Sequence, residues 1–595
     1  VLRTASVVGR NFLYRVLQAV AVMDRNLDQN LAVLESVDLI REKQRLPELE
    51  YIFKHALAQE TVYESILLQT RRGLHRQVAQ TIEDLFADRL EEFYGLLAYH
   101  YARAEAWEEA LDYLLKAGDR AGQLAADGEA LTYYRQALRT YERAFGDRWD
   151  PYQRAVLARK MGQALFRRGE HEQALENLKQ ALSLLDKSLP ESTWGIRLGI
   201  LVEGVKQIIF RLAPGLLRRA HGPDQHPVEV ECITAYESLL WIDLTRKPER
   251  FMLDTLLALN LAEQINHTER IIYTSTFFGG AFVFVGLYGL ADRYAQHALA
   301  LAEKLDQPGL LGDVYHVQAA SASWKGQPEK AIEIGGLAVK LLRETGSIHD
   351  WGNANLVVNE ATVHVGRYDS VIPVADEMIK VGQDGGDLQV LAWGHSLRGL
   401  VERYTGDPEV SIATYQKFVE IATQVQDYVS QVEGKAMIAH NYLLMDQVEP
   451  ALASLNEAER IFQEHKVRGN RFLSKIRIGF AWAHLLAVEN ATGEERKHHL
   501  DRAARECKRA RKVVRRFNRH AAEAYRLQGT CEWLRGRERQ ARRWWEKSLA
   551  LAENGQPYEL AMTYWEMGKR LDEVTYKERS REILEEIGAR FDLYE

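Results

Sequence analysis

Cysteine is scarce in this sequence. The chain has three cysteines among 595 residues, and Cys232, Cys507 and Cys531 lie far apart without forming a CxxC pair. This usage argues against the disulfide framework of a small secreted domain and fits the reducing cytoplasm. We therefore expect a cytoplasmic protein.

A strong excess of charge is also missing. The chain has 77 lysines and arginines against 84 aspartates and glutamates, and 77 − 84 gives a net charge of −7. For a chain of this length the imbalance is mild. It predicts no overall attraction to nucleic acid or to an anionic membrane.

The common catalytic signatures are absent from the sequence. Gly434-Lys435 and Gly568-Lys569 do not belong to a GxxxxGK[ST] phosphate loop, because neither has the earlier glycine or a following Ser or Thr. The sequence also has no HExxH, no GxSxG and no Cys and His set with metal-binding spacing. We expect no catalytic residue, cofactor or metal in this chain.

Glycine recurs at one fixed spacing in the middle of the chain. Forty residues separate successive members of the series Gly286, Gly326, Gly366 and Gly406. Five residues after each glycine comes a second series, which consists of Ala291, Ala331, Val371, Ser411 and Ala451. A period of roughly 20 to 50 residues is typical of solenoids, whose units bury their apolar faces against one another. We therefore expect a repeat protein.

Each unit is predicted to be two helices joined by a short turn. Apolar residues recur at spacings of three and four on both sides of Gly326, as in amphipathic helices. A glycine here suits the residue just past a helix, where φ is positive. Pro328 and Pro408 follow two residues after their glycines, in a first helical turn that does not need their amide protons. Small residues such as Ala331 let the two helices approach closely.

This frame resembles the tetratricopeptide repeat. That repeat has a small residue, an alanine twelve positions later, a large residue four further on, and a second alanine after three more. The frame is clearest in residues 319–338, 399–418 and 439–458, and it extends to units that contain Ala98, Gly118, Gly162 and Gly529. Asn359 and Val371 depart from it. The resemblance implies an all-α superhelix, or α-solenoid.

An uncharged stretch of twenty residues, Ile271 to Leu290, is long enough to span a bilayer. Gly279, Gly286 and Ala291 nevertheless fall on the small and turn positions of the repeat, and Gly286 would break a spanning helix. We therefore interpret this stretch as a buried repeat and expect no membrane partner.

The first ninety residues follow a different pattern. Helices are predicted at 13–22 and 27–37, short strands at 39–42 and 50–53 around a turn at 45–48, and further helices at 55–68 and 71–86. This is the order of a winged helix with a short β-ribbon. The segments "LESVDLIRE" and "YIFKHALAQETVYESILLQTRRGLHRQVAQTIE" resemble the part that follows the nucleotide-binding domain in bacterial signalling ATPases of the STAND type. Among STAND proteins, these segments are most similar in sequence to members fused to class III adenylate or guanylate cyclase domains.

The resemblance implies upstream ATP- or ADP-binding and cyclase domains, outside this chain. Residue 1 is Val, no signal peptide follows, and we expect a piece of a longer protein. Lys54-His55 resembles, in location, the site of a winged-helix His that contacts the phosphate of a bound nucleotide. The alternative is that His55 only caps a helix or packs against its neighbours.

DNA binding is the other function of winged helices. The helix that would enter the major groove of DNA carries acidic residues, which repel the phosphates. Only one basic residue offsets their charge. They are Asp24, Asp28, Glu35 and Asp38, against Arg25. We do not expect a nucleic-acid partner.

The sequence divides into five regions. They are a winged-helix module at 1–90, a first repeat block at 91–189, an irregular helical joint at 190–265, forty-residue repeats at 266–465, and C-terminal repeats with a basic helix at 466–595. Turn residues from Ala220 to Pro227 mark the joint.

The inner wall of the forty-residue array is the main candidate binding site. In tetratricopeptide repeats the first helix of each pair lines a concave groove, and the corresponding positions here are polar or aromatic. They are Asp313, His316, Trp324, Asn353, Glu360, His364, Trp393, Ser396, Arg403, Tyr404, Glu433 and His440. Such groups suit a protein, a peptide or a small effector. The alternative is a solvated groove without a ligand.

A basic run lies near the C-terminus. Spacings of three and four place Arg505, Lys508, Lys512, Arg515 and Arg519 on one face of a predicted helix. That face would dock an acidic partner, or it is simply a solvated surface.

These observations predict a non-enzymatic sensor and regulatory arm of a multidomain signalling ATPase. A ligand in the repeat groove would act through the winged helix on the upstream domains, with oligomerisation on activation as a further expectation. The alternatives are the arm of a transcriptional regulator with the same layout and a plain interaction scaffold.

Overall fold

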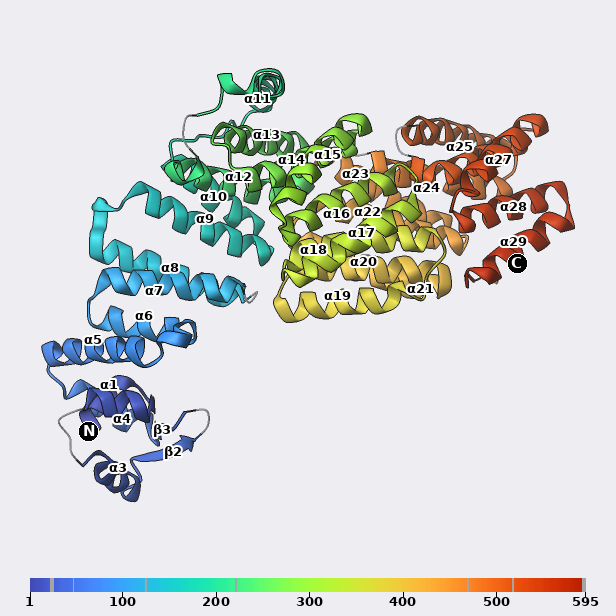
Figure 1. Ribbon diagram of the computed structural model, residues 1–595. Helices are drawn as coiled ribbons and strands as arrows, with labels where there is room; N and C mark the ends of the chain where they lie inside the picture. The colour runs from blue at the N-terminus through green and yellow to red at the C-terminus, as the bar shows by residue number, and fades with distance from the viewer. Residues whose placement is uncertain are drawn as a thin grey trace. The chain divides into compact units, whose positions relative to one another are not determined.

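The computed structural model describes residues 1–21, 26–45, 48–123, 126–219, 222–465, 467, 470–515 and 518–590. Twenty-nine α-helices, five short 3-10 helices and three short strands make up the regular structure of these residues (Figure 1). The chain forms two compact units, Val1–Ala164 and Leu165–Glu595. The division between them falls inside the repeat block predicted at 91–189.

The first unit starts with a small α/β segment. Its elements are α1 (Leu2–Val8), β1 (Asn11–Leu13), α2 (Tyr14–Val20), α3 (Leu27–Ser36), β2 (Ile40–Gln44), β3 (Glu50–Phe53), α4 (Ala56–Glu64) and α5 (Leu68–Leu85). The predicted ribbon is present as β2 and β3, and two residues of its turn, Leu46 and Pro47, lie outside the described residues. The sequence did not predict β1, which pairs with β3 to give an antiparallel sheet of order β1-β3-β2. Phe12 and Phe53, with ring centroids 5.6 Å apart, form its core.

Helix pairs follow in the first unit. They are α6 (Tyr94–Arg103), α7 (Trp107–Gln123), α8 (Asp127–Phe145) and α9 (Pro151–Arg167), and α9 runs into the second unit. A Cβ atom on Gly118 would lie 2.4 Å from the Tyr134 ring, so the small position of the frame is filled by the large residue of the next helix.

The second unit is an α-solenoid. Its first helices are α10 (His171–Leu184), α11 (Thr193–Leu212), α12 (Pro227–Arg246), α13 (Pro248–Gln264), α14 (Thr268–Val285), α15 (Tyr288–Leu305), α16 (Pro308–Trp324) and α17 (Pro328–Glu344). The middle helices are α18 (Ile348–His364), α19 (Val371–Gly385), α20 (Leu388–Thr405), α21 (Pro408–Gln424), α22 (Tyr428–Leu444) and α23 (Val448–Glu464). The last are α24 (Asn470–Asn490), α25 (Gly493–Val514), α26 (Ala521–Leu534), α27 (Glu538–Ala552), α28 (Pro557–Leu571) and α29 (Val574–Glu586).

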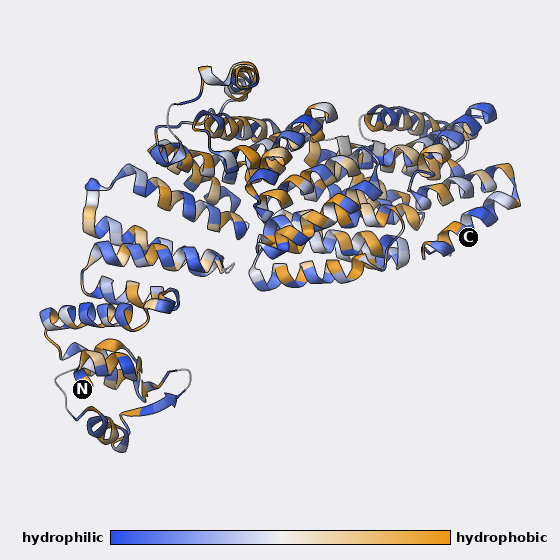
Figure 2. Cartoon of the chain, viewed as in Figure 1, coloured by the Kyte–Doolittle hydropathy of each residue, from blue (hydrophilic) through white to orange (hydrophobic). Residues whose placement is uncertain are grey.

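The repeat frame defines the packing of these helices. The alanines and their equivalents in the frame are buried: Ala291, Ala319, Ala331, Ala338, Val371, Ser411, Ala439, Ala451, Ala458, Ala541 and Ser548. Polar and apolar residues alternate around the helices, because one face of each is buried against its neighbours (Figure 2). The all-α solenoid predicted from the forty-residue period is therefore confirmed.

The turn glycines agree with the prediction at three of four positions. Gly286, Gly326 and Gly366 have φ values of 78°, 80° and 81°. Gly406 differs, with φ −115° and ψ −153°. There the Asp407 side chain accepts a hydrogen bond from the amide of Glu409 and begins the next helix, so a left-handed residue is not needed.

The stretch from 271 to 290 is divided between two helices. α14 ends at Val285 with Gly286 as its C-cap, and α15 begins at Tyr288. Among the described residues, no helix combines the length and the apolar character that crossing a bilayer requires.

The solenoid is wound tightly enough for distant helices to meet. α12 packs against α22, and α14 packs against α24. Tyr404 of α20 and Tyr558 of α28 make an edge-to-face contact at 4.6 Å. The second unit therefore has long-range contacts in addition to those between neighbouring repeats.

Gly529 provides a test of the frame. A Cβ atom on Gly529 would lie 2.3 Å from Nε1 of the fully buried Trp545, whereas Gly336 in α17 has open space around it. We expect Gly529→Ala to destabilise the protein by roughly 1–3 kcal/mol through overpacking. Gly336→Ala should stabilise it by about 0.5–1 kcal/mol, because alanine favours a helix. Thermal unfolding of both variants measures the difference, and an equal rise in Tm would contradict the frame.

Candidate functional site

The predicted groove residues lie on α16, α18, α20 and α22, and most of them are buried. Asn353, His364 and Tyr404 are half-buried. The others are less than a tenth exposed: Asp313, His316, Trp324, Glu360, Trp393, Ser396, Arg403, Glu433 and His440. The wall is therefore covered by other parts of the chain, and it divides into two sites and one isolated residue.

The first site is a cavity of about 230 Å³, which we call the aromatic cavity. Six predicted groove residues line it: His316, Trp324, Asn353, Trp393, Ser396 and Glu433. The sequence did not predict the aromatic residues that complete the lining, which are Phe166, Trp241, Phe251, Phe277, Phe418 and Phe472. Several of them come from helices before the forty-residue array, and their contribution depends on the winding of the solenoid.

His349 is the central polar group of the aromatic cavity. Its ring centroid lies 5.3 Å from Trp241, 5.2 Å from Trp393 and 5.7 Å from Phe166. Its Nδ1 atom is 3.0 Å from a carboxylate oxygen of Asp387. Burial lowers the pKa of His349, but the charge and hydrogen bond of Asp387 outweigh burial, so the pKa is raised overall. Asp387 thus stabilises the charged form of a histidine that lies among aromatic rings.

Asp387 itself is fixed by its place at the start of α20. Burial alone would raise the pKa of this carboxyl. The charge and hydrogen bond of His349 and the amides of Val390 and Gln389, each 3.0 Å away, outweigh burial and lower the pKa. A capping carboxylate therefore orients the histidine.

Two further polar groups face the aromatic cavity. Asp427 accepts hydrogen bonds from Ser430 Oγ at 2.6 Å and Gln389 Nε2 at 2.8 Å, and burial raises its pKa. Burial lowers the pKa of His316 to about 4, which keeps that ring neutral at pH 7. An apolar lining with few, fixed polar groups is the usual composition of a small-molecule site.

The second site, which we call the charged cluster, joins the other groove residues except Asp313 to the C-terminal repeats, and it shares Ser396 and Glu433 with the aromatic cavity. Arg519 Nη1 donates to Glu360 Oε2 at 2.9 Å and to Ser323 Oγ at 3.2 Å. Lys475 Nζ lies 2.6 Å from Glu433 Oε1, and Nε2 of His440 lies 3.0 Å from the Lys475 carbonyl oxygen.

Several other side chains of both parts complete the charged cluster. They include His364, Arg403, Tyr404, His520, Glu523 and Glu559. Only about 50 Å³ is open between them. This part of the groove is therefore filled by the chain itself and has no room for a peptide in the present conformation.

Asp313 lies apart from both sites. Burial raises the pKa of its carboxyl well above the usual value, and the charges of Asp350 and Glu237 raise it further. Asp313 lies on the buried side of α16.

Only part of the predicted basic run is exposed to solvent. Arg505, Lys508 and Lys512 are exposed on α25, and Arg515 is the exposed residue that follows it. Arg519 does not share that face, because α25 ends at Val514 and Arg519 lies in a separate turn of 3-10 helix at Asn518–His520. It is buried and pairs with Glu360, so it belongs to the charged cluster.

The N-terminal candidates lie in the first unit. His55 is exposed at the start of α4, after β3. Its neighbour Lys54 forms an ion pair with Asp38, which lowers the pKa of that carboxyl. Of the acidic residues that argued against DNA binding, Asp24 lies outside the described residues, as does Arg25.

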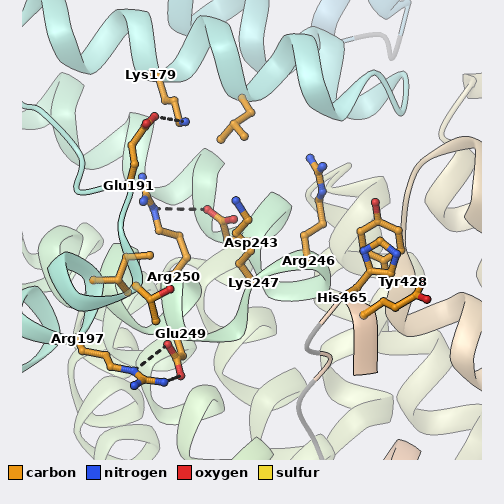
Figure 3. Close-up of a pocket in the computed structure, with 14 residues that line it drawn as sticks. Lys179, Glu191, Arg197, Asp243, Arg246, Lys247, Glu249, Arg250, Tyr428 and His465 are labelled. Carbon is orange, nitrogen blue, oxygen red and sulfur yellow. Dashed lines mark hydrogen bonds and ion pairs between the residues drawn. The ribbon is translucent and has the colours of Figure 1, made fainter. Parts of the chain in front are cut away.

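Sequence reasoning missed a polar cavity of about 750 Å³, which is lined mainly by α10, α11, α12 and α13 and also by Tyr428, Glu464 and His465. Figure 3 shows Lys179 paired with Glu191 and Arg197 paired with Glu249, each at 3.0 Å. Arg246 and Lys247 also line it. The repeat frame has no signal for this cavity, which forms in the joint.

A buried acidic pair lies beside this polar cavity. Burial raises the pKa of Asp243 and raises that of Asp254 well above its usual value, with the charge of Asp243 adding to the effect on Asp254. Nε of Arg250 is 4.0 Å from Asp243 Oδ2 and 3.7 Å from Asp254 Oδ1. Arg250 is therefore the cation that compensates these carboxyls.

Among the described residues, no cluster of His, Cys, Asp or Glu is arranged to hold a metal ion. A tetratricopeptide repeat family model matches residues 123–187. No curated protein matches the sequence.

Several solved structures are similar at low identity. A STAND protein with a tetratricopeptide repeat sensor from Pyrococcus horikoshii is 13% identical, with a TM-score of 0.28, and the match covers 98% of this chain and 64% of that one. Yeast Tom70 is 14% identical, with a TM-score of 0.31 and coverage of 85% and 99%. The Cut9–Hcn1 assembly of the APC/C is 14% identical, with a TM-score of 0.41 and coverage of 89% and 97%.

Proposed function

We propose that this chain is the sensor arm of a larger signalling ATPase, and that its effector is a small, largely apolar molecule bound in the aromatic cavity. The observation that carries the proposal is the lining of that cavity. Phe166 and Trp241 precede the forty-residue array, Phe277 comes from its beginning, Trp393 comes from its middle, and Phe472 follows it. One small ligand would therefore contact helices from α9 to α24.

The charged cluster favours a small effector over a peptide. Arg519 and Lys475 already pair with Glu360 and Glu433, the groups that a peptide would use. Opening this part of the groove would leave buried charges without partners, which is costly. The aromatic cavity needs no such opening.

The same arrangement gives a route for signalling. A ligand changes a conformational equilibrium only through a difference in affinity between two states. The aromatic cavity exists because α12 and α14 lie beside α22 and α24. A ligand in it would thus favour the tightly wound solenoid over a looser one.

The upstream part of the proposal rests on the resemblance of residues 1–120 to STAND proteins. The order of α2, α3, β2, β3 and α4 supports a winged helix in this region. In the full protein, a nucleotide-binding domain would bind ATP or ADP, His55 would contact its phosphate, and a cyclase domain would be the output. The small effector would control these domains through the first unit.

Indole is a suitable probe of the aromatic cavity, because it is a small aromatic molecule with one polar group. We expect saturating indole to raise the Tm of the chain, since a ligand at about 100 times its Kd stabilises by about 2.7 kcal/mol. Gly280→Leu should abolish the shift. Gly280 lines the cavity, and a Cβ atom there would make only an ordinary contact with Val317 at 3.6 Å, so a side chain can start at this position and the leucine should occupy the cavity.

Gly336→Leu is the matched control. It places the same side chain on a helical glycine that has open space around it and lies outside the aromatic cavity. The control should keep the full shift in Tm. An unchanged Tm of the wild-type chain with indole, or an equal shift in both variants, would refute the cavity as the effector site.

A further inference from the structure

Helix α11 exposes an apolar face that no other described part of the chain covers. Seven large apolar side chains on this helix are between 47% and 81% exposed: Trp194, Leu198, Leu201, Val202, Val205, Ile208 and Leu212. Figure 1 shows α11 almost end-on at the top of the picture, beside α13. This helix lies in the segment 190–265, where the sequence predicts an irregular helical joint.

The exposed face has the spacing of a coiled-coil seam. Trp194, Leu198, Leu201, Val205, Ile208 and Leu212 follow one another at intervals of four, three, four, three and four residues. These are the a and d positions of heptads, with Leu198, Val205 and Leu212 at a.

The opposite face of α11 packs against the rest of the second unit. Ile196, Glu203 and Phe210 are spaced by seven residues and are buried. Gln207, on the same side, donates to Asn260 of α13 at 2.7 Å. The core of the unit therefore holds one side of the helix and leaves the seam free.

The area of the seam is that of an interface. Because the seven residues are large, their exposed fractions correspond to a total exposed area of roughly 800–1,000 Å². The largest apolar patch on a typical monomer covers roughly 300–600 Å². A stable protein–protein interface buries about 800 Å² on each partner.

The order of the seam residues is symmetric about its centre. If a second α11 lies antiparallel across a two-fold axis at that centre, Trp194 faces Leu212, Leu198 faces Ile208, and Leu201 faces Val205. Each of these layers joins an a position to a d position, which is the pairing that an antiparallel coiled coil requires. An isologous dimer needs such a self-complementary surface.

The charges on α11 are compatible with this pairing. Arg197 pairs with Glu249 of α13, and Arg211 pairs with Glu263 of α13. Lys206 pairs with Glu203 of α11 itself at 2.6 Å. Because each cation is already neutralised, two copies would not repel each other at the edges of the seam.

We propose that α11 pairs antiparallel with α11 of a second copy of this chain and forms a two-fold dimer. The proposal does not depend on the effector. It gives the predicted oligomerisation a defined surface that is independent of the upstream domains.

Sedimentation velocity of the 595-residue chain tests the proposal. The wild-type chain should sediment as a dimer with twice the monomer mass of 68.1 kDa. The double variant Leu201→Asp with Val205→Asp should shift it to a monomer with little change in Tm, because both side chains are exposed in the single copy. Leu337→Asp, at a 49% exposed leucine of α17, is the matched control and should leave the dimer intact.

Cysteine cross-linking tests the orientation. The native cysteines Cys232, Cys507 and Cys531 are buried, so their background is low. A mixture of Leu201→Cys chains and Val205→Cys chains should give a mixed disulfide under mild oxidation. Homodimeric disulfides of each variant alone, formed equally well, would indicate a parallel seam and overturn the antiparallel pairing.

Two other occupants of the seam are outcomes of the same experiments. A wild-type chain that is monomeric at every concentration would overturn the proposal. A monomeric chain that also binds vesicles of phosphatidylserine and phosphatidylcholine, and loses that binding in the double aspartate variant, would assign the seam to a membrane surface instead.

Discussion

Arg519→Met is expected to destabilise the second unit by roughly 3–5 kcal/mol, because it removes the cation that pairs with the buried carboxylate of Glu360. Both side chains are less than a tenth exposed, and Arg519 also donates to Ser323. The variant should therefore lower the Tm. It should also increase amide hydrogen exchange in α16 and α18, where the C-terminal repeats cover the groove.

Two variants serve as controls for Arg519. Arg505→Met removes an exposed arginine of α25 and should change stability by less than about 0.5 kcal/mol. The double variant Arg519→Met with Glu360→Met should recover much of the lost stability, because an apolar pair can replace a buried ion pair. If Arg519→Met were as stable as Arg505→Met, the charged cluster would not hold the groove closed.

Arg250→Met should lower stability by roughly 3–5 kcal/mol at pH 7 and by less at acid pH, because it removes the cation beside two buried carboxyls. Burial already raises the pKa of Asp254 well above its usual value. A carboxyl with a higher pKa in the folded than in the unfolded state binds its proton more tightly when folded. Ionisation of such a carboxyl destabilises the folded state. This destabilisation is absent when the pH is below the pKa of the carboxyl in the unfolded state, and it grows as the pH rises toward the pKa in the folded state.

Loss of Arg250 raises the folded pKa of Asp243 and Asp254 further and widens this pH range. Urea unfolding between pH 4 and pH 8 should therefore show a stability that falls with pH more steeply in Arg250→Met than in the wild type. Arg197→Met is the control, because its ion pair with Glu249 at the rim of the same polar cavity is exposed to solvent and contributes little. A pH-independent loss in Arg250→Met would contradict the compensating role of this arginine.

The local part of the fold could be predicted from the sequence. The spacing of Gly286, Gly326 and Gly366 and the small residues after them specify helix pairs and their contacts, since both depend on residues close in sequence. The ribbon strands were also marked by turn chemistry. β1 was not, because three residues carry no periodic signal and depend on pairing with β3.

The candidate site could be predicted only in part. The repeat frame placed His316, Trp324 and Trp393 on inward positions, and they line the aromatic cavity. The frame has no information on superhelical pitch, which decides that Trp241 joins this cavity and that Arg519 reaches Glu360 across 159 positions. Such contacts depend on small rotations that accumulate over many repeats.

The seam of α11 shows the opposite case. Its spacing from Trp194 to Leu212 is visible in the sequence, but an apolar seam of this kind normally indicates a buried helix. Only the structure shows that α13 covers the other face and leaves this one exposed.

The wound solenoid is proposed to contain a site for a small apolar effector. Diffraction from crystals soaked with 5-bromoindole tests it most directly, because the anomalous signal of bromine locates the ligand without bias. We expect a single strong peak among Trp241, Trp324 and Trp393, and its loss in Gly280→Leu. Bromine peaks confined to the surface, or a peak that remains in Gly280→Leu, would contradict it.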